Sequence, residues 1–538
     1  MTTQEEYDAI VVGSGAAGGW AAKELTERGL RTILLEAGPA LDPAVAFNPP
    51  KQRKKSKLQL VSRAQAILSG QYVQARCMSF SPLTQHLFVN DRENPYDTGP
   101  GQRFNWYRSR QVGGRLHLWG RNALRISDEQ LHPATIDGFG DDWPISYAEL
   151  APWYEHVERF LGVHGSPAGI PSIPDGTYDR PLTITNAERD VLGTLAREWP
   201  DRPATTCRIV RHNPGRIPLP IVAALQTGKL TLRSDAVVSH LEVDPRTGKA
   251  TGAVYVDRRT REQHRVRGRV VVLCASTIES LRIMLNSKSA SHPQGLGNSS
   301  GSLGRYFTDH VMIFEAGPRT PLEEDPRLDP FDFGAQSGIY IPSFRNTEGR
   351  REKDFLRGYS LLGSVGRIEP GWFFMAVGEM LPRHENFVEL HPTRRDAWGI
   401  PIPRIHCTHS DNENAMVADM RRTLRDLATA CGLEVDHLRR ESLASRMIYR
   451  MTAPLVYTPA GALVPGSAIH ETGGAGMGLD RTRFVLNQFN QCWDAENVFV
   501  TDSASFTTAP FQNPGLTIMA LSARAGHYIA DQMLRREL

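Results

Sequence analysis

At the start of the chain, the hydrophobic pattern predicts a strand, a helix and a second strand. The apolar run Tyr7–Val12 leads directly into the glycine-rich stretch Gly13–Gly18, and a second apolar run, Thr32–Leu35, follows. Short apolar runs bounded by turn residues are typical of buried strands, and the stretch between them is long enough for a helix. We therefore expect residues 7 to about 38 to form one strand–helix–strand unit, with Glu36 directly after its second strand.

Later apolar runs predict that the same buried sheet resumes. The run Arg269–Ala275 is typical of a strand buried on both faces, and a helical pattern covers Thr277–Leu285. Near the end of the chain, Asn497–Asp502 predicts a buried strand and Leu516–Leu534 a helix. Before these elements, three short strands separated by turn residues predict a β-meander: Leu230–Leu232, Ala236–Val243 and Ala253–Val256.

The order of these elements predicts an α/β fold with a discontinuous first domain. We expect this nucleotide-binding domain to comprise residues 1–145, 228–311 and 461–538. Residues 146–227 and 312–460 are richer in proline, aromatic residues and mixed strands. We expect them to form a second domain by insertion.

The glycines at the first turn have separate physical tasks. Gly13 permits a tight turn, Gly15 lets a pyrophosphate approach the backbone, and Gly18 lets the helix pack close to the strand. The phosphates would then lie at a helix N-terminus. Glu36 lies where a carboxylate accepts hydrogen bonds from both hydroxyls of an adenosine ribose. This pattern predicts an ADP-containing cofactor and leaves NAD and FAD open.

A second glycine-rich segment, Val112–Arg121, combines paired glycines with tryptophan and arginine. Such a segment permits close approach of the backbone to a flat anionic ligand. A glycine turn on an aromatic core has the same composition, so both interpretations stay open.

Composition and charge narrow the class of protein. The chain has 538 residues, 22% of them charged, and a net charge of +3, without an extended basic array, so we expect no nucleic-acid partner. The basic run Lys51–Lys57 is expected to be a solvated loop, with contact to an acidic surface, a lipid headgroup or a partner protein as the alternatives. No apolar stretch is long enough for a membrane span, and the polar start Met1–Glu6 does not resemble a secretory signal. We therefore expect a cytoplasmic protein.

Several smaller motifs suggest other chemistry. The six cysteines lack a Cys-x-x-Cys pair, which excludes a cysteine-ligated iron–sulfur cluster and suits a reducing compartment. His406–His409 contains three potential metal ligands, but we expect no metal site, because the two histidines would project to opposite sides of a strand. Gly297–Gly301 matches a hydrolase pattern but lacks the strand and helix that a nucleophile elbow needs. Trp372–Phe374 could stack on a sugar ring or belong to the core.

Four segments in the right order resemble the glucose–methanol–choline (GMC) oxidoreductase family, over nearly the whole chain. They are Asp8–Gly38, Val112–Arg121, Val270–Leu285 continued by Gly304–His310, and Asn497–Gly526. The resemblance implies FAD as the cofactor. It also implies a Rossmann-like FAD-binding domain with an inserted mixed-sheet substrate-binding domain, an architecture like that of p-hydroxybenzoate hydroxylase.

The resemblance implies a set of cofactor-binding residues spread over the first domain. These are Gly13, Gly15, Ala16, Ala17, Gly18, Glu36, Ala37, Arg110, Val112, Gly113, Gly114, Leu118, Trp119, Gly120, Val237, Ala275, Asp502, Asn513, Pro514 and Thr517.

The active site that the resemblance implies consists of His470 and Asn513. Alcohol oxidation needs a base for the O–H proton, and a histidine tuned near neutral pH suits that task. Asn513 would donate to the oxygen as negative charge develops. The hydride would pass to flavin N5.

The asparagine and the Val112–Arg121 segment look closer to pyranose oxidases and bacterial glycoside oxidoreductases than to methanol or glucose oxidases. Pyranose oxidases carry a flavin-linked histidine immediately before the tryptophan of this segment, where this chain has Leu118, with His117 one position earlier. If the segment is extended, that offset turns His117 to the other face. We therefore expect non-covalent FAD.

The expected substrate is a sugar or glycoside whose secondary hydroxyl becomes a ketone. Glu379 or Arg383 could bind sugar hydroxyls on a strand pair formed by Gly378–Arg383 and Glu385–Leu390; a strand-edge charge pair is the alternative. Oxygen or another acceptor would reoxidise the flavin, and an oligomer is possible. Three alternatives stay open: oxidation of another alcohol such as a glycosylated natural product or sterol, a non-redox FAD-bound lyase, and an electron-transfer subunit.

Overall fold

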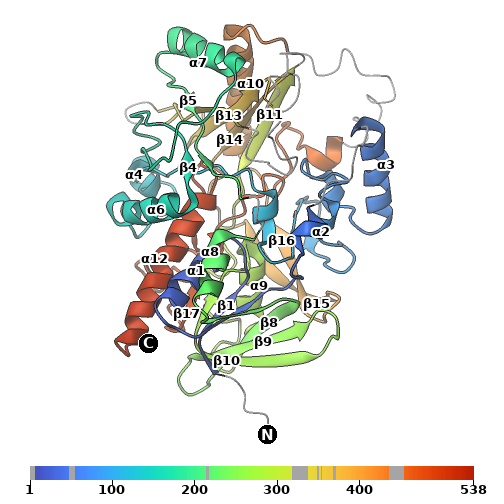
Figure 1. The fold of residues 1–538 in the computed structure, drawn as a ribbon, viewed down its shortest axis with the longest axis vertical. Helices are drawn as coiled ribbons and strands as arrows, with labels where there is room; N and C mark the ends of the chain where they lie inside the picture. Colours follow the sequence, from blue (N-terminus) through green and yellow to red (C-terminus); the bar gives the residue numbers. More distant parts are fainter. Residues whose placement is uncertain are drawn as a thin grey trace.

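The computed structural model describes residues 6–47, 55–213, 217–317, 337–347, 351–352, 354–367, 371–435 and 453–538. Its main sheet lies in the lower half of Figure 1 and joins segments from the beginning, middle and end of the chain. The strands, in spatial order, are β7 (Leu230–Arg233), β2 (Thr32–Leu35), β1 (Glu6–Val12), β10 (Gln263–Leu273), β9 (Ala250–Asp257) and β8 (Ala236–Val243), with β17 (Val498–Val500) paired to β10.

The core of this sheet is parallel. Strand β1 pairs in parallel with β2 on one side and β10 on the other, and β17 pairs in parallel with β10. The carboxyl ends of these strands therefore meet at one edge, where an open α/β sheet binds its ligands. Strands β8, β9 and β10 form an antiparallel meander. The prediction that Leu230–Leu232 belongs to that meander is wrong, because β7 pairs in parallel with β2.

Helices cover this sheet. Helix α1 (Ala16–Glu27) connects β1 to β2 and packs against α12 (Gly515–Leu534) and α8 (Leu219–Gln226), while α6 (Tyr147–Leu161) packs against α12. Helix α9 (Thr277–Asn286) follows β10 and contacts β8. The predicted strand–helix–strand unit, the later strands and both later helices are thus confirmed, since β10, α9, β17 and α12 lie where the apolar runs placed them.

A second sheet occupies the upper half of Figure 1 and is antiparallel throughout. Its order is β11 (Val311–Gly317), β14 (Trp372–Gly378), β13 (Tyr359–Val365), β12 (Ile339–Ile341) and β5 (Thr205–Thr206). Helix α10 (Asp411–Ala430) packs on β11 and β14, and α7 (Asn186–Glu198) packs on β13 and α10. The side chains of Trp372 and Phe374 are buried in the core, while Phe373 contacts Phe314.

The third sheet corrects the expected strand pair at Glu379. It consists of β15 (Phe387–Arg395), β16 (Pro401–His406) and β3 (Asp97–Thr98), whereas the segment before Glu379 belongs to β14 of the second sheet. Strand β15 pairs with β16 and β14 pairs with β11 and β13, so the two predicted partners do not pair. Strands β4 (Val163–His164) and β6 (Ile209–Val210) form a small separate pair.

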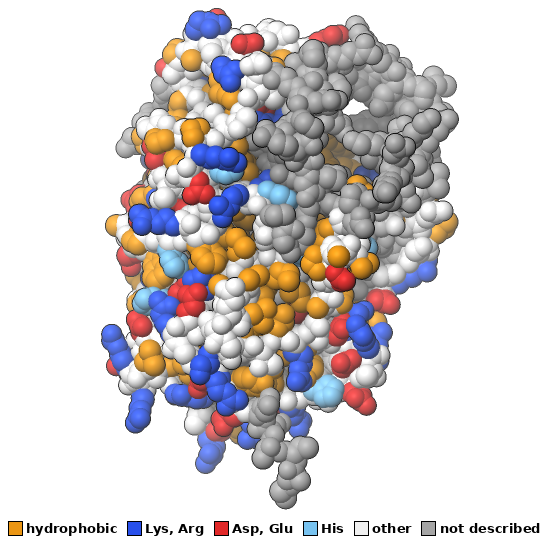
Figure 2. Space-filling view, viewed as in Figure 1, with side chains coloured by type: hydrophobic (Ala, Val, Ile, Leu, Met, Phe, Trp, Pro, Cys, Tyr) orange, Lys and Arg blue, Asp and Glu red, His pale blue; other side chains and the backbone are white. Residues whose placement is uncertain are grey.

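Further helices lie between these strands in the sequence or after the last of them. They are α2 (Pro43–Ala46), α3 (Lys55–Leu68), α4 (Asp128–Leu131), α5 (Pro133–Asp137), η1 (Gln74–Arg76), η2 (Gln85–Leu87), η3 (Gly114–Leu118) and η5 (Ser503–Ser505). The end of the basic run thus starts a helix rather than a loop, and Lys51–Lys54 lies outside the described residues. Across the described residues, no helix is long and apolar enough to cross a membrane. Figure 2 shows basic and acidic side chains interspersed over one face, with hydrophobic side chains gathered near its centre.

Candidate active site

The glycine turn between β1 and α1 has the close contacts that the sequence predicts. Gly13 has φ +97°, and a Cβ added there would lie 2.4 Å from the carbonyl oxygen of Cys274. A Cβ at Gly18 would lie 1.8 Å from the carbonyl oxygen of Gly13. At Gly15, by contrast, no described atom lies within 4 Å of the added Cβ. Two glycines therefore allow backbone packing, and the third leaves open space.

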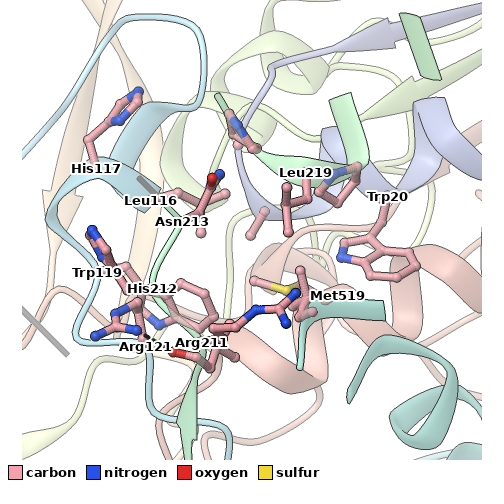
Figure 3. A pocket seen from close by; sticks show the side chains of 16 residues that line it. Trp20, Leu116, His117, Trp119, Arg121, Arg211, His212, Asn213, Leu219 and Met519 are labelled. Atoms are coloured by element: carbon pink, nitrogen blue, oxygen red, sulfur yellow. Dashed lines mark hydrogen bonds between the residues drawn. The ribbon is translucent and has the colours of Figure 1, made fainter. Parts of the chain in front are cut away.

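That open space continues as a cavity at the N-terminus of α1 (Figure 3). The cavity is open to solvent, has a volume of about 790 Å³ with this open part included, and has Gly15 and Ala16 in its lining. In Figure 3, Trp20 and Leu219 lie on one side and Trp119 and Arg121 on the other. No described side chain caps the first turn of α1, so its backbone N–H groups suit the phosphates of a dinucleotide. His470 and Asn513 do not line this cavity.

Glu36 is buried at the end of β2 and accepts three hydrogen bonds. Ser14 donates from its hydroxyl at 2.5 Å and from its backbone N–H at 3.1 Å, and the Gly38 N–H donates at 2.9 Å. Burial raises the pKa of Glu36, and these hydrogen bonds oppose that shift. The Gly113 N–H donates to the Ser14 hydroxyl at 3.0 Å, so the two glycine-rich segments lie against each other.

The second glycine-rich segment differs from the expected extended strand. Gly113 has φ +95°, and residues Gly114–Leu118 form the 3-10 helix η3. The premise that His117 faces away because the segment is extended is therefore wrong. His117 lines the cavity beside α1, and its Nε2 lies 2.7 Å from the carbonyl oxygen of Val112. Trp119 lies beside the start of α12, where a Cβ at Gly515 would be 3.1 Å from Trp119 Nε1.

The other expected cofactor residues are spread over several elements. Arg110 is paired with Glu279 at 2.6 Å, and Val237 is buried in a small cluster that Ala37 packs against. Ala275 follows β10, and its N–H donates to the Ser280 hydroxyl. The remaining ones are Ala17 in α1, Leu118 at the end of η3, Gly120 after Trp119, and Pro514 and Thr517 at the start of α12.

Asp502 follows β17 and is a buried carboxylate. The Ser280 hydroxyl donates to it at 2.5 Å and the Ala504 N–H at 3.0 Å. Burial raises its pKa to about 6, against these hydrogen bonds. A carboxylate at this sheet edge suits the hydroxyls of a ribityl chain.

The two expected catalytic residues lie together although they come from separate segments. The side-chain nitrogen Nδ2 of Asn513 lies 3.3 Å from Nε2 of His470. His470 has a second partner that the sequence analysis did not assign, since its Nδ1 lies 2.9 Å from Nδ1 of His310. Nε2 of His310 in turn lies 2.8 Å from the carbonyl oxygen of Pro510.

This chain of contacts fixes the positions of the ring hydrogens. The Pro510 carbonyl only accepts, so His310 donates to it from Nε2. Burial lowers the pKa of His310 to about 4, so the neutral ring offers Nδ1 as an acceptor. His470 then donates from Nδ1. The lone pair of His470 Nε2 therefore accepts from Asn513 Nδ2, so the basic nitrogen of the ring faces Asn513.

Burial also lowers the pKa of His470 well below its ordinary value, with smaller contributions from His310 and Arg115. A buried carboxylate, Asp309, holds the backbone of this loop: it accepts from the N–H of His470 at 3.0 Å and of Gly466 at 2.6 Å. Burial and the neighbouring Glu471 raise the pKa of Asp309 to about 7.

Arg115 connects η3 to the catalytic loop. It forms an ion pair with Glu471 at 2.6 Å and donates to the Ser276 hydroxyl at 2.7 Å. The sequence analysis assigned no role to Asp309, His310, Arg115 or Glu471. Asp309 and His310 are the last two residues of the segment Gly304–His310, whose resemblance to the family was the feature of the sequence that could have indicated them.

The two expected substrate residues lie in different surroundings. Glu379 is buried beside Arg357 and lines a second cavity. Arg383 donates to the carbonyl oxygen of Thr408, beyond the end of β16, and does not line that cavity. The structure therefore separates these residues rather than placing them on one strand pair.

The alternative motifs lack a matching geometry. Among the described residues, no group of three His, Cys, Asp or Glu side chains is arranged to hold a metal ion. His406 instead stacks on Phe387 at the end of β16. Gly297–Gly301 lies in turns and bends, without an adjoining strand and helix.

Comparison with known proteins relates the chain to flavin-dependent enzymes. A family model described as GMC oxidoreductase matches residues 382–522, and one described as FAD binding domain matches residues 8–47. The chain is 27% identical to a 2-methyl-1,2-propanediol dehydrogenase of Mycolicibacterium austroafricanum, covering 98% of this chain and 96% of the relative. It is 25% identical to the fructose dehydrogenase large subunit of Gluconobacter japonicus, covering 98% of each.

A third relative, the C-glycoside 3-oxidase of Microbacterium trichothecenolyticum, is 24% identical over 98% of this chain and 97% of its own length. The fold is shared with the crystal structure of pyridoxine 4-oxidase from Mesorbium loti, at a TM-score of 0.61, 17% identity, and coverage of 97% and 98% of the two chains. The α1 turn, the buried acid after β2 and these matches agree on FAD as the cofactor. Together, the two family models and the relatives that cover nearly the whole chain support its membership in the GMC family of FAD-dependent alcohol oxidoreductases.

Proposed function

We propose that this enzyme oxidises a secondary CH–OH group of a sugar or glycoside to a ketone. The observation that carries the proposal is the contact between His470 and Asn513, because it presents a neutral base beside a hydrogen-bond donor. The names of two relatives, a fructose dehydrogenase and a C-glycoside 3-oxidase, support a sugar or glycoside as the substrate.

In this proposal the substrate hydroxyl enters between the two side chains. It donates to His470 Nε2, which takes the proton, and its oxygen accepts from Asn513 Nδ2. The asparagine dipole stabilises the negative charge that develops on that oxygen. When bound, FAD supplies the acceptor for the hydride that leaves the carbon.

The glycine turn, Glu36, Asp502 and the Val112–Arg121 segment would hold the cofactor. The main sheet with its helices would form the FAD-binding domain, and the five-stranded sheet with α10 would form the core of the substrate-binding domain. We keep residues 1–145, 228–311 and 461–538 as the proposed FAD-binding domain, although α6 and α8 of the segment 146–227 pack against α12 and α1.

The test is replacement of His470 by alanine. We expect FAD to stay bound while the rate of flavin reduction by substrate falls by about 10²–10⁴-fold, because general-base catalysis contributes an effect of that size. Anaerobic bleaching of the flavin, measured with a panel of sugars, glycosides, small diols and sterols, gives both the rate and the substrate class. Undiminished reduction in His470→Ala would reject the role of the histidine, and bleaching by none of the sugars would reject the substrate class.

We also propose that FAD is bound without a covalent link. Leu118, at the position before Trp119, carries no group that could form one, and the His117 ring lies against the Val112 carbonyl. After denaturation and filtration, the yellow colour should pass the membrane with the small molecules. Colour retained by the polypeptide would contradict the proposal.

A small diol is a second candidate substrate. The similarity to the 2-methyl-1,2-propanediol dehydrogenase favours it, because the alignment covers almost the whole length of both proteins. The same bleaching panel separates the two, since a small diol would then reduce the flavin faster than any sugar.

A further inference from the structure

A second cavity, of about 720 Å³ with its solvent-open part included, lies beside the segment that carries Asn513. Its lining includes Gln130 of α4, Ile136 and Asp137 of α5, Glu379 after β14, and Phe511. The cavity therefore combines one aromatic side chain with several polar groups, a composition that suits a sugar ring.

The cavity is connected to the catalytic pair through residues 510–513. Pro510 accepts from His310, and Asn513 contacts His470. Between them, Phe511 lines the cavity and Gln512 exchanges two side-chain hydrogen bonds with Gln130, at 2.7 and 2.9 Å. Because His470 and Asn513 do not themselves line the cavity, a ligand held in it would have to extend beyond it to reach them.

The interior of the cavity contains charged groups whose hydrogen bonding is incomplete. Glu379 is 4% exposed, and its Oε1 has no hydrogen-bond partner among the described residues. Arg357 is 6% exposed, and its Nη1 lies 3.8 Å from that oxygen, too far for a hydrogen bond. Arg357 Nε lies 2.8 Å from Asp137 Oδ2, and Nη2 donates to the Phe139 carbonyl at 2.7 Å. Buried charges with unused hydrogen-bonding capacity are costly unless a ligand completes them.

Burial raises the pKa of Glu379 to about 7, opposed by Arg357, and also raises that of Asp137. Ligand hydroxyls both donate and accept, so they can satisfy a carboxylate and a guanidinium together. An apolar ligand would leave Glu379 Oε1 and Arg357 Nη1 without a hydrogen bond.

We propose that this cavity binds the second, non-reacting ring of a glycoside substrate through hydrogen bonds from its hydroxyls to Glu379 and Arg357. The reacting ring would lie at His470 and Asn513. This inference rests on the proposed function and adds to it a preference for substrates that have at least two rings.

The test uses the FAD-bound enzyme and the variant Glu379→Gln, which keeps the shape of the side chain and removes its charge. Maltose, cellobiose and lactose serve as two-ring probes, with glucose and methyl glucoside as one-ring comparators. We expect the ratio of kcat/KM for the best disaccharide to that for the monosaccharide to fall about tenfold, the size of one lost hydrogen bond to a charged group. The rise of the wild-type melting temperature with that disaccharide should be lost as well.

Two further variants serve as a second test of the cavity and as a control outside it. Ile136→Trp narrows the cavity without removing a buried charge, and it should lower the same ratio even if Glu379→Gln does not fold. Glu389→Gln, a carboxylate of β15 outside the cavity, is the matched control and should leave the ratio unchanged.

The outcomes separate the two proposals. If sugars bleach the flavin but neither cavity variant changes the ratio, the cavity proposal is overturned and the proposed function stands. If no sugar bleaches the flavin but a disaccharide still raises the wild-type melting temperature and not that of the cavity variants, the cavity binds glycosides and the proposed function is wrong. A wild-type melting temperature unchanged by every disaccharide overturns the cavity proposal.

Discussion

The carbonyl group of Pro510 determines the hydrogen positions of two histidines that lie 160 residues apart in sequence. It accepts from His310, and His310 in turn accepts from His470. A base is useful only if its lone pair points at the substrate, so this arrangement gives His310 the role of a positioning residue. It touches His470 and acts through it.

Replacement of His310 tests this role. Alanine cannot accept from His470 Nδ1, so the ring can adopt the wrong tautomer, and we expect kcat/KM for flavin reduction to fall about 10- to 100-fold. Glutamine offers an amide oxygen to His470 and an N–H to Pro510, so His310→Gln should recover part of the loss. Steady-state and stopped-flow kinetics measure both variants.

The pH profile of activity distinguishes a positioning role of His310 from a purely structural effect of its replacement. His470 must be neutral to act, and burial lowers its pKa, so wild-type activity should be lost only as the pH falls well below the ordinary histidine value of about 6.5. In His310→Ala, water entry should weaken the desolvation, and the acid limb should move up toward that value. If the acid limb of the pH profile stays where it is and glutamine restores no activity, His310 contributes only to packing.

For single residues, the resemblance to the family named His470 and Asn513 as one active site but did not name His310 as the second partner of His470. His310 was missed because a hydrogen bond across 160 positions depends on how the chain folds. Glu379 and Arg383 were grouped because both belong to the segment Gly378–Arg383, which was expected to pair with Glu385–Leu390, yet only Glu379 faces the second cavity.

Among the elements, the β1–α1 turn has the tightest packing requirement. Gly18 lies in the first turn of α1, against the Gly13 carbonyl. Gly18→Ala should therefore push the helix away from the strand, lower the free energy of unfolding by about 1–3 kcal/mol, and weaken FAD binding. Thermal melting and the flavin-to-protein absorbance ratio measure the two effects.

Gly193→Ala is the matched control. Gly193 is exposed in α7, and an added Cβ there would have only Arg197 Nη1 nearby, at 3.8 Å. Alanine should stabilise this helix by up to about 1 kcal/mol. A Gly18→Ala protein as stable as wild type, with full flavin content, would show that the close packing at the turn is dispensable.

Hydrophobic periodicity predicted β1, α1, β2, β10, α9, β17 and α12, since the pattern of each element is contained in its own residues. Periodicity did not predict which strands pair, because pairing depends on residues outside the strand itself. Strand β7 pairs with β2 rather than with the meander, and β15 pairs with β16 rather than with the segment at Glu379. The 3-10 helix η3 was also missed, because paired glycines allow several backbone conformations.

Taken as a whole, the molecule assembles its expected cofactor site from segments at both ends and in the middle of the chain. Gly15, Glu36, Gly113, Ala275 and Asp502 all follow strands or turns around the edge where the parallel strands end. A ligand that contacts all these segments binds the folded state and not the unfolded chain.

Removal of FAD should therefore lower stability. At a free FAD concentration of about 100 times Kd, the cofactor should add about 2.7 kcal/mol to the free energy of unfolding. The measurement is thermal melting of the deflavinated protein during an FAD titration. NAD, which shares the ADP part, is the control and should give a smaller shift; a melting temperature indifferent to FAD would contradict this expectation.

The sequence by itself determined the dinucleotide turn, the acid that follows it, the order of the main elements and the family. These depend on local requirements: glycine conformations, hydrophobic periodicity and short spacings. Only the tertiary structure decided that His310 contacts His470, that β7 joins β2, and that Glu379 and Arg357 share a cavity beside Phe511. Those contacts join residues far apart in sequence, so they depend on strand pairing and packing over the whole chain rather than on any one segment.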